Sequence, residues 1–226
     1  MSFKSSDGIA LSAAYRAPAK GKPVFVLLHG LGAGRGEWAD FSELLAERGY
    51  GSLALDARGH GRSGGPRFET FRTTEAWEKL ELDLEAALAW LRLRKVPASR
   101  TVLGGASIGA NLALRVAARH PDVRCALLLS PGLAYQGVAI EGALTSFRGT
   151  LLLAAAPDDP YAFRTVEWAA ERTQGSGSRF LQAATGHGVR MFEGEANKPF
   201  VRELMKAIGE ALRPSSASSS GSRASP

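Results

Sequence analysis

Short apolar runs alternate along the chain with longer stretches in which apolar and polar residues are mixed. The clearest run, Val24-Phe25-Val26-Leu27-Leu28, has no polar position and is too short for a helix. A run of this kind is typical of a strand buried on both faces of a parallel sheet. We predict strands at residues 24–28, 51–55, 101–106, 125–129, 150–155 and 180–183.

The mixed stretches between these runs repeat their apolar residues at helical spacing. In residues 74–94, for example, Leu80, Leu84, Leu88 and Leu91 fall on one face of a helix. Helices are predicted at residues 37–48, 74–94, 108–119, 163–172 and 199–212. Strands that alternate with helices of these lengths imply crossover connections and a mostly parallel sheet covered on both faces.

The two ends of the chain differ from this alternating pattern. Residues 3–16 read as two short strands joined at Asp7-Gly8, a dipeptide that favours a tight hairpin turn. Residues 213–226 are Ser-rich and have no apolar periodicity, which predicts a disordered tail. The remaining residues, 1–212, have the length of a single domain with one substantial core.

Composition narrows the class of protein. No apolar run approaches the ~20 residues needed to span a bilayer, and the first residues lack the apolar segment of a signal peptide. A single cysteine makes no internal disulfide, so we expect a reducing, cytoplasmic setting. The net charge of +6 is spread along the chain without a dense basic run, and we expect neither a nucleic-acid nor a membrane partner.

The strongest chemical signal is Gly105-Ala106-Ser107-Ile108-Gly109. The motif follows a predicted buried strand and opens a predicted helix, as the strand-to-helix elbow of a serine nucleophile requires. Gly and Ala on both sides of Ser107 let strand and helix approach closely, and the positive end of the helix favours negative charge. The alternative is a Gly-rich strand-to-helix loop without chemistry.

A serine hydroxyl needs a base, and the base needs an acid that orients it. Of the histidines after Ser107, His120 lies at a helix end, whereas His187 lies in a turn after the last strand. We therefore predict His187 as the base. For the acid we favour Asp159 over Asp158, which is free to cap the next helix or meet solvent. Both aspartates also suit a simple turn before proline.

The oxyanion formed in acyl transfer needs donors fixed in advance. The backbone N–H of Ile108, directly after the serine, is one candidate. Leu31 supplies the second, because its amide follows the turn at His29-Gly30 after a buried strand. His29 itself is predicted to have a structural hydrogen-bonding role.

Taken together, these motifs resemble the α/β-hydrolase superfamily. The matching segments are the His29-Gly30 turn, Asp56-Ala57-Arg58-Gly59-His60-Gly61-Arg62-Ser63, the elbow at Ser107, Asp159 before Pro160, and Gly186-His187-Gly188. The resemblance implies a single α/β-hydrolase domain with an eight-stranded, mostly parallel sheet and the chain order Ser107, Asp159, His187. It also implies structural rather than catalytic roles for Asp56 and His60.

The chain departs from many relatives between the strands at residues 125–129 and 150–155. Residues 131–149 are too few for the multi-helix cap that many relatives carry there. The resemblance is therefore to small lidless members, often carboxylesterases, thioesterases or dienelactone-hydrolase-like enzymes. Candidates for the pocket wall are Trp38, Phe68, Leu133 and Tyr135.

The sequence thus predicts a Ser-Asp-His hydrolase that cleaves a small-molecule ester or thioester through an acyl-enzyme on Ser107. Two alternatives stay open: another reaction on the same triad, such as C–C hydrolysis or perhydrolysis, and a ligand-binding protein with little turnover. No cofactor and no metal is expected, because the histidines are scattered and the glycines at 30, 32 and 34 lack a dinucleotide fingerprint.

Overall fold

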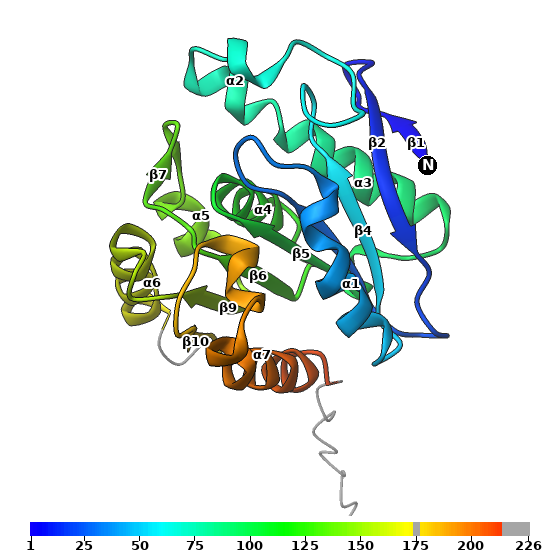
Figure 1. Cartoon of the computed structure of the whole chain (residues 1–226). Coiled ribbons are helices and arrows are strands. Elements are labelled where there is room, and N and C mark those ends of the chain that lie inside the picture. Colours follow the sequence, from blue (N-terminus) through cyan, green and yellow to red (C-terminus); the bar gives the residue numbers. More distant parts are fainter. Residues whose placement is uncertain (174–176, 214–226) are drawn as a thin grey trace, which may run out of the picture.

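The computed structural model of the protein describes residues 1–173 and 177–213, and its sheet has the predicted eight strands (Figure 1). The strand order is β1-β2-β4-β3-β5-β6-β9-β10; β1 and β2 run antiparallel to their neighbours and the other pairs are parallel. Their bounds are β1 (Ser2–Lys4), β2 (Ala10–Arg16), β3 (Val24–Leu28), β4 (Gly51–Asp56), β5 (Thr101–Ala106), β6 (Cys125–Leu129), β9 (Thr150–Ala155) and β10 (Arg179–Gln182). Apart from Arg213, the predicted tail lies outside the described residues.

Helices cover both faces of the sheet, as the alternation of strands and helices predicts. One face packs against α1 (Ala39–Ala46) and α7 (Lys198–Ala211), and α1 passes in front of the sheet in Figure 1. The other face packs against α2 (Thr74–Glu78), α3 (Glu81–Leu93), α4 (Ile108–Arg119), α5 (Glu141–Ser146) and α6 (Pro160–Arg172). Within the described part of the chain, no helix combines the length and apolar character needed to cross a membrane.

The central strands end together at one edge of the sheet. The parallel register places Leu28 of β3 beside Gly105 of β5, and Leu129 of β6 beside both Ala106 and Ala154. Because ligands bind at the carboxyl ends of parallel strands, the loops that leave this edge are where a site is expected. These are the loops that carry the predicted site residues.

The predicted helix at residues 74–94 is two helices. The chain leaves α2 at Lys79 and enters α3 at Glu81, and the amides of Leu80, Leu82 and Asp83 bond to carbonyls three residues back. This tighter turn breaks the α-helical ladder. The apolar spacing continues through the break, so periodicity alone predicts one helix.

The segment between β6 and β9 carries no multi-helix cap, as predicted. It holds a small hairpin of β7 (Ala134–Tyr135) and β8 (Val138–Ala139), followed by the short helix α5. Gln136 and Gly137, at the hairpin turn, have φ angles of 52° and 80°. Positive φ at both central residues is typical of the tight turn that matches strand twist. These short elements were not predicted from the sequence.

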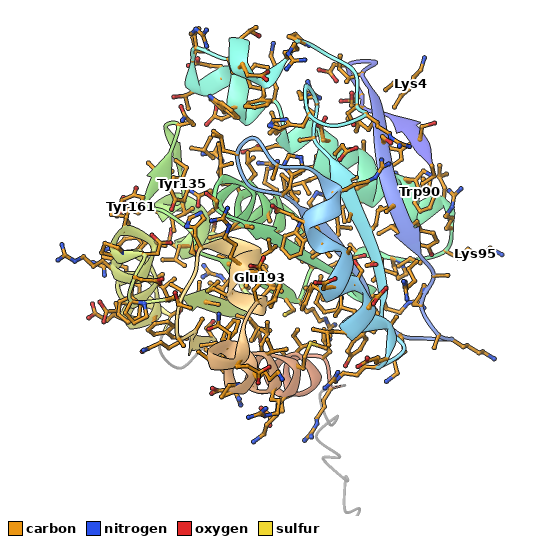
Figure 2. All side chains as sticks on the ribbon, viewed as in Figure 1. Lys4, Trp90, Lys95, Tyr135, Tyr161 and Glu193 are labelled. Carbon is orange, nitrogen blue, oxygen red and sulfur yellow. The ribbon has the colours of Figure 1, made fainter. Side chains whose placement is uncertain are left out.

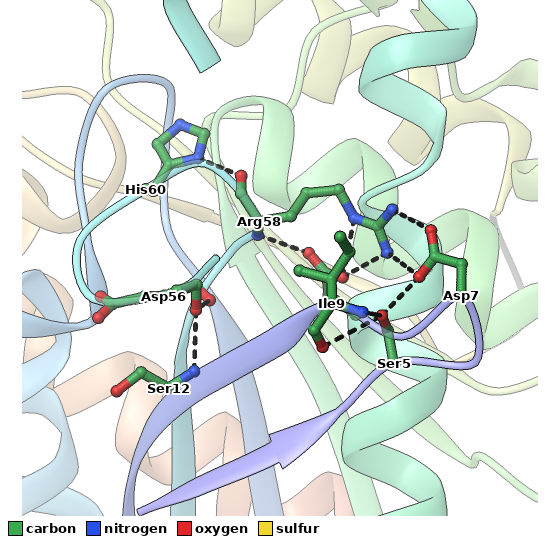
Figure 3. A network of polar contacts seen from close by, with 9 residues as sticks. Ser5, Asp7, Ile9, Ser12, Asp56, Arg58 and His60 are labelled. Atoms are coloured by element: carbon green, nitrogen blue, oxygen red, sulfur yellow. Dashed lines mark hydrogen bonds and ion pairs between the residues drawn. The ribbon is translucent and has the colours of Figure 1, made fainter. Parts of the chain in front are cut away.

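An ionic network around the buried side chains of Arg58 and Asp83 fixes the turn after β4 (Figure 3). The Arg58 guanidinium donates to Asp83 Oδ1 through Nε at 3.0 Å and Nη2 at 2.8 Å, and it donates to both carboxylate oxygens of Asp7. Its hydrogen bonds lower the pKa of Asp7 to about 2. The residues on either side of Arg58 also make structural contacts. Asp56 accepts the backbone N–H of Arg35 at 2.8 Å, and His60 stacks on Phe68, as expected for structural residues.

Candidate active site

Ser107 lies at the sharp turn between β5 and α4. Its backbone has φ 55° and ψ −126°, a conformation that costs a non-glycine residue free energy and marks a candidate functional position. The amide of Ser107 donates to the carbonyl of Leu129 in the neighbouring strand at 2.9 Å. The turn therefore holds the Ser107 side chain at the carboxyl edge of the sheet.

Two glycines make this turn sterically feasible. A Cβ at Gly105 would lie 2.2 Å from the carbonyl of Gly109, and a Cβ at Gly109 would lie 2.4 Å from the carbonyl oxygen of Leu28. Neither distance is compatible with a side chain. The small residues predicted to allow close approach of strand and helix are thus required at both positions.

His187 and Asp159 meet beside this turn. The imidazole Nδ1 of His187 lies 2.6 Å from Asp159 Oδ2, while Asp159 Oδ1 accepts the amide of Ala162 at 3.3 Å at the start of α6. One carboxylate therefore both caps α6 and holds the imidazole. The His187 side chain is 44% exposed, which leaves the ring accessible to a small molecule.

The loop around His187 is fixed from both sides. Asp158 accepts the hydroxyl of Thr185 and the amide of Gly186, the latter at 2.9 Å. The hydroxyl of Ser130, at the tip of β6, accepts the amide of Gly188 at 2.9 Å. Asp158 therefore does not cap α6; it is exposed to solvent, as considered for it, and at the same time accepts these two hydrogen bonds. Like Ser130, it positions the loop on which His187 stands.

The predicted oxyanion donors are unpaired. The backbone N–H groups of Leu31 and Ile108 donate to no other residue in the described ranges. The neighbouring amide of Gly30, by contrast, donates to Glu37 Oε1 at 3.1 Å. Gly30 lies so close to the nucleophile turn that a Cβ there would be 3.5 Å from Ser107 Cβ. The loop after β3 therefore brings the Leu31 amide to the side of Ser107.

His29 has the structural role predicted for it. Its Nε2 accepts the backbone N–H of Ala57 at 3.0 Å, and its Nδ1 donates to the carbonyl of Gly30 at 2.7 Å. Burial lowers its pKa to about 4, so the ring is neutral near pH 7. His120, the other histidine after the serine, pairs with Glu85 at 2.7 Å away from the site.

A pocket of about 390 Å³ opens over Ser107 and His187. It is lined by Gly30, Leu31, Ala33, Glu37, Ala106, Ser107, His187, Gly188, Val189 and Arg190. None of the four candidates for the pocket wall lines it. Trp38 is buried in the core, Phe68 lies on His60, and Leu133 is 44% exposed. Tyr135 contacts the His187 ring with a centroid separation of 6.4 Å.

Glu37 is a pocket residue that the sequence analysis did not single out. It stands at the start of the segment before α1, where an acidic side chain reads as an ordinary helix-start residue. Burial raises its pKa to about 7, and the hydrogen bond from the Gly30 amide opposes that rise. Near neutral pH, this carboxyl therefore changes its protonation beside the oxyanion loop.

Replacing Glu37 by glutamine is expected to flatten the pH dependence of stability. The folded state holds the Glu37 proton more tightly than the unfolded state, in which the pKa is near 4.5. Its contribution is thus present below pH 4.5 and is lost as the pH rises to about 7, a loss of about 2 kcal/mol after allowance for solvent screening. Glu37→Gln should lose less stability than wild type between pH 5 and 8 in urea unfolding.

The exposed Glu47→Gln is the matched control and should follow the wild-type pH dependence. Equal changes in the free energy of unfolding for wild type and Glu37→Gln across this pH range would contradict the burial argument.

Comparison with known proteins identifies the fold family. A family model described as the alpha/beta hydrolase fold matches residues 23–185. The chain belongs to the α/β-hydrolase fold family. The match extends from the strand before the oxyanion loop to Thr185, two residues before His187.

Solved α/β-hydrolase structures share the whole architecture. An esterase of Pyrococcus furiosus superimposes with a TM-score of 0.73 at 22% identity, covering 94% of this chain and 88% of the other. Est1E of Butyrivibrio proteoclasticus, solved with ferulic acid, gives 0.76 at 18% identity, covering 94% and 99%. Dienelactone hydrolase of Anabaena variabilis gives 0.75 at 20% identity, covering 94% and 97%. These likenesses establish the fold without a large cap domain.

The curated sequence relatives match a shorter part of the chain than these solved structures do. A Mycobacterium phage D29 protein named for a non-heme haloperoxidase activity is 34% identical over 105 residues, 46% of this chain and 34% of that protein. An Arabidopsis thaliana 1-acylglycerol-3-phosphate O-acyltransferase is 33% identical over 133 residues, 58% of this chain and 30% of that protein. The chain thus spans about a third of the length of these curated relatives.

Proposed function

We propose that the protein is a serine hydrolase that cleaves a carboxylic ester or thioester through an acyl-enzyme on Ser107. The observation that carries this proposal is the arrangement of Ser107, on a positive-φ elbow, in one pocket with a His187 imidazole held by Asp159 at 2.6 Å. A strained serine, a base and an orienting acid are the parts that acyl transfer needs.

Each group has a defined part in the reaction. His187 Nε2 takes the Ser107 proton as Oγ attacks the carbonyl carbon, and the amides of Leu31 and Ile108 receive the oxyanion. The imidazolium then gives its proton to the leaving oxygen or sulfur as that bond breaks. Water repeats these steps on the acyl-enzyme and releases the acid. Asp159 holds the ring so that Nδ1 keeps its hydrogen throughout.

The pocket favours modest acyl groups. Its volume of about 390 Å³ is near the lower end of small-molecule sites, and it opens to solvent beside the exposed His187. Neighbouring structures include a carboxylesterase of Nitrososphaera gargenis and an acetyl xylan esterase of Paenibacillus. Such names support ester substrates for this chain, with short acyl chains preferred.

A series of p-nitrophenyl esters tests the proposal. The purified protein should hydrolyse the acetate and butyrate esters faster than the dodecanoate ester. Failure of the folded protein to hydrolyse any ester or thioester of the series would contradict the assignment. Stabilisation by an ester without turnover would point to a binding protein of the same fold.

The acid is identified by comparing two adjacent aspartates. Asp159→Asn should lower kcat/KM for p-nitrophenyl acetate by roughly 10³- to 10⁴-fold, because the amide no longer fixes the imidazole tautomer. Asp158→Asn keeps an acceptor oxygen for the Gly186 amide and should lower kcat/KM by less than about 10-fold. Steady-state kinetics of the two variants distinguish the roles, and the reverse order of losses would assign the acid to Asp158.

The similarity to the phage protein named for haloperoxidase activity supports perhydrolysis as a second candidate activity. A serine hydrolase that admits hydrogen peroxide in place of water forms a peracid from the acyl-enzyme, and the peracid oxidises halide. Bromination of monochlorodimedone in the presence of acetate, peroxide and bromide measures this activity. A rate that requires acetate and Ser107 supports peroxide as an alternative acceptor, and no bromination restricts the acceptor to water.

A further inference from the structure

Tyr135 lies beside Ser107 on the hairpin formed by β7 and β8. Its ring meets the His187 ring edge-on with centroids 6.4 Å apart, and the Ser107 side chain lies near enough to its hydroxyl to lower the pKa of that hydroxyl against a larger rise from burial. Figure 2 shows Tyr135 next to Tyr161 at the end of the hairpin. The side chain thus contacts the candidate base and lies near the candidate nucleophile, although it does not line the pocket beside Leu31.

The hairpin is attached to the helix that begins at the nucleophile. Asn111 lies one turn after Ser107 and is fully buried. Its Nδ2 donates to the carbonyls of Gly132 at 2.9 Å and Val138 at 2.7 Å, and its Oδ1 accepts the Gly132 amide at 3.1 Å. A buried amide with all these partners is costly to displace. Asn111 therefore fixes the segment that leads into β7, and β8 itself, relative to Ser107.

A second attachment comes from the helix that follows Asp159. The Tyr161 hydroxyl accepts the amide of Ala134 at 3.1 Å, and its ring meets Tyr135 edge-on at 5.4 Å. A Cβ at Gly132 would lie 2.6 Å from the Tyr161 ring and 2.7 Å from the Tyr135 ring. The two rings therefore close over a glycine that has no room for a side chain, which limits the positions open to Tyr135.

The Tyr135 hydroxyl is a donor at neutral pH. Burial raises its pKa, the negative charge of Asp159 and the neighbouring Tyr161 raise it further, and hydrogen bonding with Ser107 only partly opposes them. A phenol that keeps its proton beside a reacting oxygen can stabilise charge on that oxygen without being consumed.

We propose that Tyr135 is a catalytic residue whose hydroxyl donates a hydrogen bond to the leaving-group oxygen as the ester bond breaks. The leaving oxygen must lie within reach of His187 Nε2, which protonates it. Tyr135 contacts His187 and lies near Ser107, whereas the oxyanion faces the separate amides of Leu31 and Ile108. This inference rests on the proposed ester hydrolysis and adds a donor for the departing group.

The step balances without any further reactant. The carbonyl carbon keeps its bond to Ser107 Oγ, and the bond to the leaving oxygen breaks with both electrons going to that oxygen. The proton comes from the His187 imidazolium. Tyr135 keeps its own proton and shares it only as a hydrogen bond, so it returns unchanged for the next turnover.

The test is the dependence of Tyr135→Phe on the leaving group. Wild type and variant are compared in kcat/KM, which reports acylation, on the p-nitrophenyl, phenyl and ethyl esters of one acid. p-Nitrophenol is acidic, so its oxygen leaves with little need of a hydrogen-bond donor. The ethyl ester would release the strongly basic ethoxide, which needs such a donor. Tyr135→Phe should lower kcat/KM by less than about 3-fold for the p-nitrophenyl ester and by roughly 10- to 100-fold for the ethyl ester.

Tyr161→Phe is the matched control, since it loosens the same hairpin but its hydroxyl faces the Ala134 backbone. Tyr161→Phe should change kcat/KM for all three esters by the same factor. An equal loss on every ester for Tyr135→Phe, or no loss, would overturn the inference and leave Tyr135 a packing residue. A wild-type protein that hydrolyses none of the esters would instead refute the proposed function.

Discussion

Ser107→Ala is expected to lower kcat/KM for p-nitrophenyl acetate by roughly 10⁵-fold or more. The alanine removes the only atom that forms the acyl-enzyme and keeps the backbone turn and the pocket. The expected residual rate comes from water activated near His187 and from the oxyanion donors. Steady-state kinetics on the purified variant measure the loss, and near wild-type turnover would place the nucleophile elsewhere.

Stability measurements separate this loss from misfolding. Ala and Ser are equally strained at φ 55°. The midpoint of urea unfolding of Ser107→Ala should therefore equal that of wild type. Glycine adopts this conformation freely, and Ser107→Gly should be more stable by about 1 kcal/mol while equally inactive. A Ser107→Gly variant less stable than wild type would contradict the account of a strained elbow.

The largest expected effect on stability is at Asp83. Its carboxylate is 0% exposed and accepts the Arg58 backbone amide as well as two bonds from the Arg58 guanidinium, itself 4% exposed. Asp83→Ala leaves that buried cation with Asp7 alone. We expect a loss of about 3–5 kcal/mol in the free energy of unfolding, measured by urea denaturation.

An exposed ion pair provides the comparison. Arg67 and Glu69 are 79% and 47% exposed, so Glu69→Ala should leave the free energy of unfolding almost unchanged. In a further variant, Arg58→Met combined with Asp83→Leu, the unpaired charge is removed, and this double variant should be more stable than Asp83→Ala. If Asp83→Ala and Glu69→Ala cost the same, the buried network does not hold the turn after β4.

The sequence predicted the frame of the site because each part has a local signature. Ser107 lies in a run of small residues between a buried strand and a helix, and the structure shows that Gly105 and Gly109 have no room for a Cβ. Asp159 and His187 follow successive strands, whose carboxyl ends share one edge of the sheet. Their contact at 2.6 Å follows from that topology.

Other features depend on contacts that have no local signature. Asn111 is a polar residue inside an apolar helix, which marks it as unusual, but its partners Gly132 and Val138 lie just before and within a hairpin too short to predict. Glu37 reads as a helix-start residue until the folded loop buries it beside Gly30. Tyr135 was considered only as a pocket wall, because its approach to Ser107 depends on the same hairpin.

The most direct test of the central claim is the site of covalent labelling by a fluorophosphonate, which reacts with activated serines. Intact-mass spectrometry of the wild-type protein should show one adduct, and peptide mapping should place it on Ser107. Ser107→Ala should stay unlabelled, and Asp159→Asn should label far more slowly than wild type. A folded wild-type protein that remains unlabelled, or an adduct on another residue, would contradict the claim that Ser107 is an activated nucleophile.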